Sequence, residues 1–462
     1  MPRRPLLLVM LLAGCSPEGR QGQPGAPDLA AVPPDMAASS GATRCAAGPA
    51  HRLSSLPGAH RSAKVAFTGA GFVVAWNTEA PGGAHRIDVA VTDGNGHALG
   101  PNIPLSAPPV ATADPPSLAP LVGGTAVAWS RAAAAGSDIV LSTLDGSGQR
   151  LDVNGVACDP ADAACGIFAV TSSHAASAPA LGRPQADARS AAPTNSQVAL
   201  AFVDARNHPC SGAGCSGFND VYWKKLQTNG TVLTPERALT PAGANLRSAA
   251  PRMAFDGAHD GVVWRDDTLA DLSRFAFVTV DQDGALTSGP TRVAVASGIA
   301  TVTGTPGLVW SRDSYALATG DGDASGASVV FQRFASNGNG ALAGVPVTFG
   351  RSSCAPTLAY DGLRYANAWQ TPCSDPRSAV AFELIDEDGV RVQSNGQSCG
   401  TSTAPNCGVI AVADDASFWA GAPDVAWAGG SSFGVAWQQH PLFDGGDGED
   451  DVWFARVDCV NP

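Results

Sequence analysis

Short runs in which apolar and polar residues alternate cover most of the chain after residue 60, and glycine, asparagine and aspartate separate them. An alternation of this period is typical of β-strands, and the separating residues are those that tight turns prefer. Two runs recur as a pair, Pro-x-apolar-Ala-aromatic-x-Gly and then a run that ends in tryptophan. The pair is clearest at 251–264, 356–369 and 423–437, and 63–76 and 116–129 follow it closely.

A third alternating run and a glycine-containing turn come after each pair. They occupy residues 86–96, 138–148, 220–230, 274–284, 329–338 and 379–389, and a seventh copy ends at Asp458-Cys459. Most copies then carry a fourth extended segment, such as 100–108. The second strands are predicted to end at Trp76, Trp129, Phe202, Trp264, Trp310, Trp369 and Trp437.

Seven units of four antiparallel strands resemble a seven-bladed β-propeller, over about residues 45 to 459. The units lack the Gly-His and Trp-Asp signatures of the WD40 family, and they look more like the loose propeller repeats of secreted bacterial lipoproteins. The expected fold class is therefore all-β, with a long β-helix or two β-sandwiches as the competing fold. The tryptophans are expected to pack between blades as core rather than to hold a cofactor.

The seventh repeat lacks a fourth strand, and the N-terminal segment supplies a candidate. Residues 48–54 match residues 100–106 in register, with Gly-Pro first and Leu-Ser last. Residues 46–55 are therefore predicted to pair with the last strand and complete the last blade, which removes two exposed strand edges. Cys45 and Cys459 then lie where the hairpin turn is missing, and a disulfide between them is predicted.

Eleven cysteines occur, and setting Cys15 aside leaves an even number, which predicts disulfides in an exported protein. Local spacing predicts the pairs Cys158–Cys165, Cys210–Cys215 and Cys399–Cys407, and Cys354 and Cys373 remain as the last pair. Zinc binding is the alternative, but no Cys-x-x-Cys occurs and the eight histidines are scattered.

Residues 1–14 carry two arginines and a short apolar run, as a secretory signal does. Leu12-Ala13-Gly14-Cys15 resembles the lipobox of bacterial lipoproteins, which implies lipidation of Cys15, and Ser16 resembles the residue found in outer-membrane lipoproteins. An ordinary signal peptide is the alternative. Residues 15–44 are predicted to be a disordered Pro/Gly/Ala-rich tether before the propeller at 45–462.

The formal net charge of −13 disfavours nucleic acid and anionic membrane surfaces as partners. We therefore expect the lipid anchor to be the only contact with the membrane. The protein is expected to be a monomer. No cofactor is predicted. Structural calcium is a weak possibility at an acidic stretch that is more simply a solvated loop, with Asp444, Asp447, Glu449 and Asp450 as its carboxylates.

Polar side chains follow the second strands, where they are predicted to line one mouth of the central channel. The candidate binding residues are Arg131, Asp204, Arg206, Arg265, Asp266, Arg312, Asp313, Gln370, Gln438 and His440. Guanidinium and carboxylate groups around a funnel could bind a glycan or a peptide. They could equally pair with each other and hold adjacent loops together.

Two functions follow as hypotheses. The first is a non-catalytic binding or interaction scaffold displayed on the cell envelope, with a glycan or a protein as ligand. The second is a sialidase-like hydrolase, because arginine-lined propellers include such enzymes, and it requires a nucleophile and a carboxylic acid in the funnel. The Asp-box of sialidases, Ser-x-Asp-x-Gly-x-x-x-Trp, is missing, and no catalytic residue is assigned.

Overall fold

The computed structural model describes most of the unit Ala42–Pro462. The described residues are 44–106, 111–133, 136–182, 197–207, 218–241, 247–266, 274–293, 302–321, 329–337, 345–346, 353–373, 377–393, 397–400, 407–415, 417–442 and 450–460. The signal peptide, most of the tether, the predicted lipidation site, and the cysteines at 210 and 215 lie outside them.

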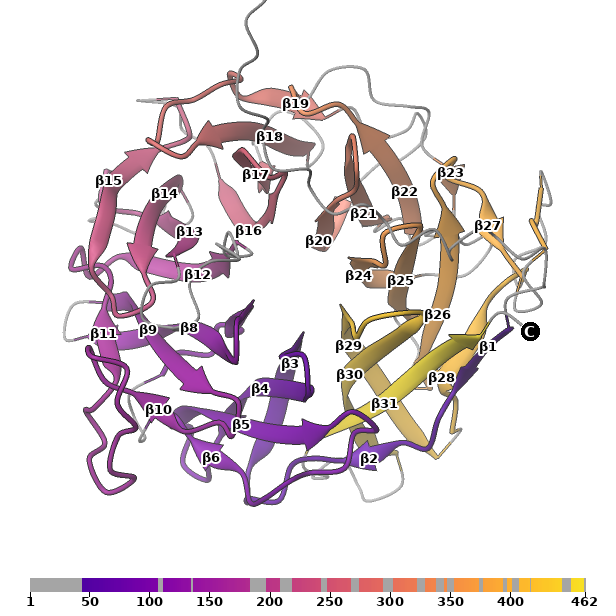
Figure 1. Ribbon diagram of the computed structural model, residues 1–462, viewed down its shortest axis with the longest axis horizontal. Coiled ribbons are helices and arrows are strands. Elements are labelled where there is room, and N and C mark those ends of the chain that lie inside the picture. The colour runs from indigo at the N-terminus through magenta and orange to yellow at the C-terminus, as the bar shows by residue number, and fades with distance from the viewer. Residues whose placement is uncertain are drawn as a thin grey trace, which may run out of the picture. The chain divides into compact units, whose positions relative to one another are not determined.

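The described strands form seven antiparallel sheets of four or five strands each, arranged as the blades of a ring (Figure 1). The first three blades are β3 (Ala59–Phe67), β4 (Gly71–Glu79), β5 (His85–Asp93) and β6 (Ile103–Pro104); β7 (Ser117–Leu121), β8 (Gly124–Ala133), β9 (Gly136–Asp145), β10 (Arg150–Leu151) and β11 (Ile167–Ala169); and β12 (Ala176–Leu181), β13 (Gln197–Asp204), β14 (Asp220–Gln227) and β15 (Val232–Ala238).

The other four blades continue the same order along the chain. They are β16 (Ser248–Phe255), β17 (His259–Asp266), β18 (Arg274–Asp281) and β19 (Thr291–Val293); β20 (Val302–Trp310), β21 (Tyr315–Asp321), β22 (Val329–Phe334) and β23 (Val345–Pro346); β24 (Cys354–Tyr360), β25 (Arg364–Thr371), β26 (Ala379–Asp386), β27 (Arg391–Val392) and β28 (Ile410–Ala413); and β29 (Phe418–Trp427), β30 (Ser432–Pro441) and β31 (Asp451–Val460), completed by β1 (Arg44–Ala47) and β2 (His51–Arg52). The first strand of each blade is called here the inner strand. The predicted seven-bladed, all-β propeller is confirmed.

The last blade is closed by the beginning of the chain. In Figure 1 the indigo strands β1 and β2 run along the yellow strand β31, and Cys45 pairs with Cys459 in the register of the sheet. The predicted correspondence between residues 48–54 and 100–106 is confirmed by their main-chain hydrogen bonds. Leu53 N donates to Val452 O at 2.8 Å, as Leu105 N donates to Ile87 O at 2.8 Å in the first blade.

Four of the five predicted disulfides lie within the described residues and all four are confirmed. Cys45–Cys459 joins the two ends of the ring, and Cys354–Cys373 links the start of β24 to the residues after β25. Two further disulfides each close a loop between two short outer strands. They are Cys158–Cys165, between β10 and β11, and Cys399–Cys407, between β27 and β28. Zinc ligation is therefore wrong for these eight cysteines.

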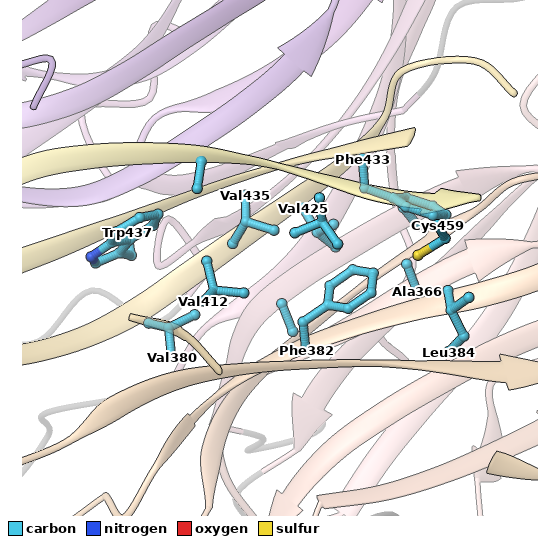
Figure 2. Packing of buried hydrophobic residues seen from close by; sticks show 14 of the residues in the cluster. Ala366, Val380, Phe382, Leu384, Val412, Val425, Phe433, Val435, Trp437 and Cys459 are labelled. Atoms are coloured by element: carbon cyan, nitrogen blue, oxygen red, sulfur yellow. The ribbon is translucent and has the colours of Figure 1, made fainter. Parts of the chain in front are cut away.

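Apolar side chains fill the spaces between neighbouring blades, and the described residues form seven such clusters, one at each boundary. Figure 2 shows the cluster between the sixth and seventh blades, where Phe433 and Phe382 lie near Cys459 and Trp437 lies at the opposite end. The predicted packing role of the strand-ending aromatics is confirmed for Trp76, Trp129, Phe202, Trp264, Trp369 and Trp437, all of them almost completely buried.

The fifth blade departs from the prediction. Trp310 ends the inner strand β20 and pairs with Tyr315, the first residue of the second strand β21. The expectation that Trp310 ends a second strand is therefore wrong. Pro306 and Trp310 have the spacing of Pro251 and Phe255, so the aromatic belongs to the first half of the repeat.

Candidate functional site

The two faces of the propeller carry different connections because neighbouring strands are antiparallel. The loop face carries the connections from second to third strands and those that lead into the next inner strand. The turn face carries the turns from first to second strands and from third to fourth strands. The predicted binding residues were all assigned to the loop face.

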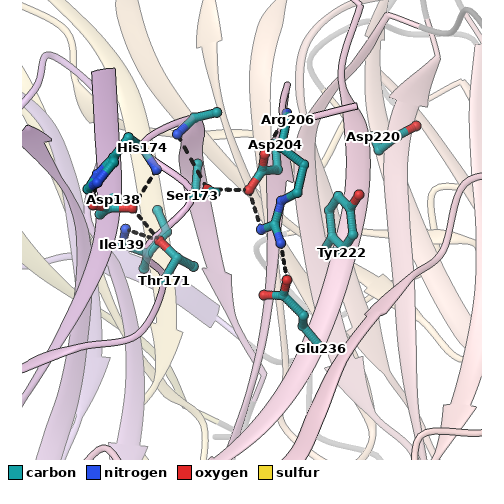
Figure 3. Close-up of polar contacts among 12 residues, drawn as sticks. Asp138, Ile139, Thr171, Ser173, His174, Asp204, Arg206, Asp220, Tyr222 and Glu236 are labelled. Atoms are coloured by element: carbon teal, nitrogen blue, oxygen red, sulfur yellow. Dashed lines mark hydrogen bonds and ion pairs between the residues drawn. The ribbon is translucent and has the colours of Figure 1, made fainter. Parts of the chain in front are cut away.

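Asp204 and Arg206 meet on the loop face of the third blade, where they form an ion pair together with Glu236 of the outer strand β15 (Figure 3). The Asp204 side chain is 0% exposed, and it also accepts hydrogen bonds from Ser173 Oγ at 2.6 Å and from Arg206 N at 2.8 Å. Several donors from different segments therefore converge on this one buried carboxylate. The cluster therefore ties the segment before β12 to the end of β13.

Tyr222 lies next to this cluster, with the Arg206 guanidinium 4.6 Å from the centre of its ring. Burial and the neighbouring Asp220 raise the pKa of the Tyr222 phenol. A raised pKa disfavours the phenolate that a tyrosine nucleophile would need. An open cleft of about 480 Å³ adjoins Arg206, Lys224 and Glu236, and both described cations in its lining are close to carboxylates.

His440 and Asp450 form the corresponding cluster of the seventh blade. His440 Nδ1 lies 2.8 Å from Asp450 Oδ1, and Arg61 Nε donates to Asp450 Oδ2 at 3.0 Å. The His440 ring also stacks on Trp419, with 4.9 Å between ring centres. Asp450, proposed from sequence as a weak calcium ligand, is therefore bonded to protein side chains. Asp444, Asp447 and Glu449 lie outside the described residues, and no group of three metal-ligating side chains occurs among the described ones.

Gln370 and Gln438 occupy the residue after the buried tryptophan and reach across to the next blade. Gln438 Oε1 accepts a hydrogen bond from Ser62 N at 3.0 Å, and Gln370 Oε1 accepts one from Ala422 N at 3.4 Å. Asn77, in the same position of the first blade, donates to Thr112 O at 2.5 Å. These amides join successive blades.

The remaining predicted residues do not form one site. Arg131, Arg265 and Asp266 lie on the loop face in the second and fourth blades. Arg312 and Asp313 belong to the turn between β20 and β21, so their assignment to the loop face is wrong. On the turn face, Asp313 pairs with Arg333 at 2.8 Å, and Arg312 pairs with Glu387 at 3.7 Å.

The inner strands surround a central cavity of about 260 Å³. Six of them are interrupted near their start by a β-bulge, which lets a strand bend and re-aims the next side chain. Five of these bulges hold a non-glycine residue at positive φ: Ser62, Ala178, Ala250, Ala355 and Ala422. The bulges set which side chains reach the channel.

The residues that end these bulges lie at a similar depth in the channel, called here the charged level. The charged residues at this level are Lys64, Arg252 and Asp424, and Thr357 is a polar member. Asp424 accepts hydrogen bonds from Val65 N at 2.9 Å and Thr357 Oγ1 at 3.1 Å, and Lys64 Nζ lies 3.5 Å from it. Burial lowers the pKa of the Lys64 amine and of the Arg252 guanidinium, although Asp424 opposes both shifts.

A collar of aromatic side chains lines the same cavity where it opens to the turn face. Its members are the half-buried residues Phe67, Phe255, Trp310, Tyr360 and Trp427, the last residues of five inner strands. Burial, and then a hydrogen bond to Glu387, raise the pKa of the Tyr360 phenol. The channel therefore joins a charged level to an aromatic mouth.

The prediction from sequence missed both features of the channel, although the repeat contains a signal for each. The collar is the aromatic of the Pro-x-apolar-Ala-aromatic motif, and the charged level is the variable residue after its proline. In three repeats this variable residue is Arg252, Thr357 or Asp424. A polar residue that recurs at a fixed place in otherwise apolar repeats indicates a shared environment.

No known family model and no curated protein sequence matches the chain. A protein of unknown function from Dyadobacter fermentans is similar in structure, with a TM-score of 0.51 and 9% sequence identity over 90% of this chain and 99% of that one. This likeness shows a shared fold. An endosialidase of phage phi92 (TM-score 0.47, 9% identity, 90% of this chain and 70% of that one) and an arabinanase of Penicillium chrysogenum (TM-score 0.44, 12% identity, 74% and 98%) are weaker matches that do not bear on activity.

The described part of the chain contains no helix that is long and apolar enough to cross a membrane.

Proposed function

We propose that the chain is a lipoprotein, anchored to the outer membrane through Cys15, that presents its propeller as a non-catalytic binding scaffold. Its ligand is a glycan or a protein segment that binds at the aromatic collar of the channel. The binding role is supported by the architecture of the propeller. The anchor is supported by the sequence, because residues 12–15 resemble a lipobox.

The collar is the observation that carries the binding role. Five aromatic residues from the same repeat position keep part of their surface accessible around one cavity of about 260 Å³. Concave sites lined by aromatic side chains with a few polar groups are where proteins bind small ligands. Aromatic rings present flat apolar faces that can stack on the carbons of a sugar or on apolar side chains.

The state of the charged groups favours binding over hydrolysis. A glycosidase needs an acid that gives and takes a proton beside a nucleophile. Asp204 and Asp450 are each bonded to an arginine, and the raised pKa of Tyr222 disfavours a phenolate. Asp424 is the one carboxylate among the described residues that line the channel, and three donors surround it.

Glycan-array binding of the full-length chain in detergent tests the collar. We expect binding that is strongly reduced in Trp427→Ala and in Trp310→Ala. Trp419→Ala is the matched control, because Trp419 is an aromatic residue on the loop face stacked on His440. Binding that survives both collar substitutions and is lost in the control would refute the collar. Absence of any glycan binding leaves a protein ligand, to be sought by crosslinking from position 427.

Metabolic labelling with palmitate tests the anchor separately. The native chain should be labelled and the Cys15→Ser chain should not. Equal labelling of the two chains would contradict lipidation at Cys15, without bearing on the collar.

A further inference from the structure

The channel holds an excess of positive charge among its described residues. Lys64 and Arg252 line it together with a single carboxylate, that of Asp424. Lys64 Nζ lies 3.5 Å from Asp424 Oδ1, so this pair is largely neutral as a unit. The charge of Arg252 remains.

The positive charge of Arg252 has few interaction partners in the described part of the protein. Its one described side-chain hydrogen bond goes from Nη1 to the carbonyl oxygen of Pro251, at 3.0 Å. No described carboxylate lies within ion-pair distance of its guanidinium, and Asp424 already accepts from Val65 N and Thr357 Oγ1. A guanidinium has five N–H donors and is a strong bidentate partner for a carboxylate.

Apolar side chains make up part of the cavity wall beyond Arg252. Leu308, Val309 and Leu358 line it on the side of the fifth and sixth blades, and the aromatic collar surrounds its opening on the turn face. Its volume of about 260 Å³ lies slightly below the 300–1,000 Å³ typical of ligand pockets. The same cavity therefore offers a cationic group at one end and apolar and aromatic side chains beyond it.

We propose that the channel binds a small monocarboxylate with an apolar or aromatic body, whose carboxylate is held by Arg252 next to the Lys64–Asp424 pair. This inference rests on the proposed function only in placing a ligand in the channel. A single negative charge fits because Asp424 repels a second one, and the same repulsion disfavours a more highly charged anion such as phosphate.

Calorimetric titration of the full-length chain in detergent with phenylacetate tests the site, with phenylacetamide as a neutral ligand of the same shape. We expect a Kd for phenylacetate of about 0.1–1 mM, the range for about ten heavy atoms in a partly apolar pocket. Phenylacetamide should bind at least about tenfold more weakly, since one charge-assisted bidentate contact is worth that much. Inorganic phosphate should not compete.

Arg252→Met keeps an unbranched apolar side chain and removes the guanidinium charge, so it should lower the affinity for phenylacetate to that for the amide. Arg52→Met is the matched control, because Arg52 is an arginine on the outer strand β2 that is paired with Asp451. It should leave the affinity unchanged. Equal affinity for acid and amide, or full affinity in Arg252→Met, overturns the proposal. If Arg252→Met does not fold, the acid-against-amide comparison in the native chain decides alone.

The outcome is independent of the glycan array. A positive array with no discrimination between acid and amide would keep the collar and remove the carboxylate site. A negative array with the expected titration would keep the carboxylate site and remove the glycan ligand.

Discussion

The loop face and the central channel use charged side chains in opposite ways. On the loop face, Arg206 pairs with both Asp204 and Glu236, and Asp450 binds Arg61 and His440. In the channel, Arg252 has no described carboxylate partner. Concentrated charge on the surface of a repeat protein can therefore be structural, whereas a cation in the channel with no described carboxylate within ion-pair distance indicates a ligand.

The difference has a consequence that can be measured. Substitutions on the loop face should change stability and leave binding intact, while substitutions in the channel should change binding first. Four changes test this separation, beginning with the one expected to have the largest effect.

Opening the ring should affect both regions. The double variant Cys45→Ser, Cys459→Ser removes the bond between residues 414 positions apart and should lower the free energy of unfolding by about 5 kcal/mol, at the upper end for disulfides. Lys64 and Asp424 lie on the first and last blades, which the opening of the ring would let move apart. Phenylacetate affinity should therefore fall as well. Urea unfolding and titration of the same preparation measure the two effects. A stability equal to that of the native chain would contradict the ring clasp.

Asp204→Ala should affect stability alone. It leaves Arg206 with Glu236 as its remaining carboxylate, and it removes the charged acceptor of Ser173 Oγ and Arg206 N, so we expect a loss of about 3 kcal/mol. Denaturant unfolding should show this loss, while phenylacetate binding at low temperature stays unchanged. Arg312→Gln is the control, because an ion pair with a 55% exposed arginine contributes at most about 1 kcal/mol. A binding defect in folded Asp204→Ala would place the ligand on the loop face.

Gln438→Ala should have a smaller effect of the same kind. The substitution removes the acceptor of the partly buried Ser62 N–H, and a donor left unsatisfied there should destabilise the protein by about 1 kcal/mol. Gln438→Glu keeps an acceptor oxygen and should recover part of the loss. The thermal midpoint at fixed pH measures both variants. Unchanged stability in Gln438→Ala would show that the contact between the last and first blades does not depend on this amide.

The pH dependence of binding should report on Lys64. Burial lowers the pKa of its amine, so the charged form is lost at a lower pH than in an ordinary lysine. Phenylacetate affinity should therefore fall severalfold as the pH rises through this lowered pKa, below 10.5. The same shift makes folding stability rise over that range, because the unfolded chain binds more protons. Lys64→Arg stays charged, and its affinity should be flat across the titration; a fall of equal size in this variant would assign the effect to another group.

Sequence patterns predicted the repeats, the ring closure and the disulfides because each depends on residues at regular positions. Gly48-Pro49 and Leu53-Ser54 repeat residues 100–101 and 105–106, and the same main-chain hydrogen bond follows at both places. Trp310 was assigned to the wrong strand because tryptophan also fits the aromatic position of the inner strand. The register relative to Pro306 distinguishes the two positions.

The candidate site was harder to predict for a physical reason. Which side chains enter the channel depends on bulges where alanines such as Ala250 and Ala422 adopt positive φ, a conformation that residue type does not indicate. Loop-face arginines were conspicuous in the sequence, but their partners come from other strands. Glu236 lies 30 residues from Arg206 along the chain, and no local motif connects the two.

Hydroxyl-radical footprinting of the full-length chain, with and without saturating phenylacetate, tests most directly whether the ligand site is the channel. The account predicts protection of the collar residues Trp310, Tyr360 and Trp427, and unchanged labelling of Trp419 and His440 on the loop face. Protection of Trp419 and His440 with no change in the collar would contradict it.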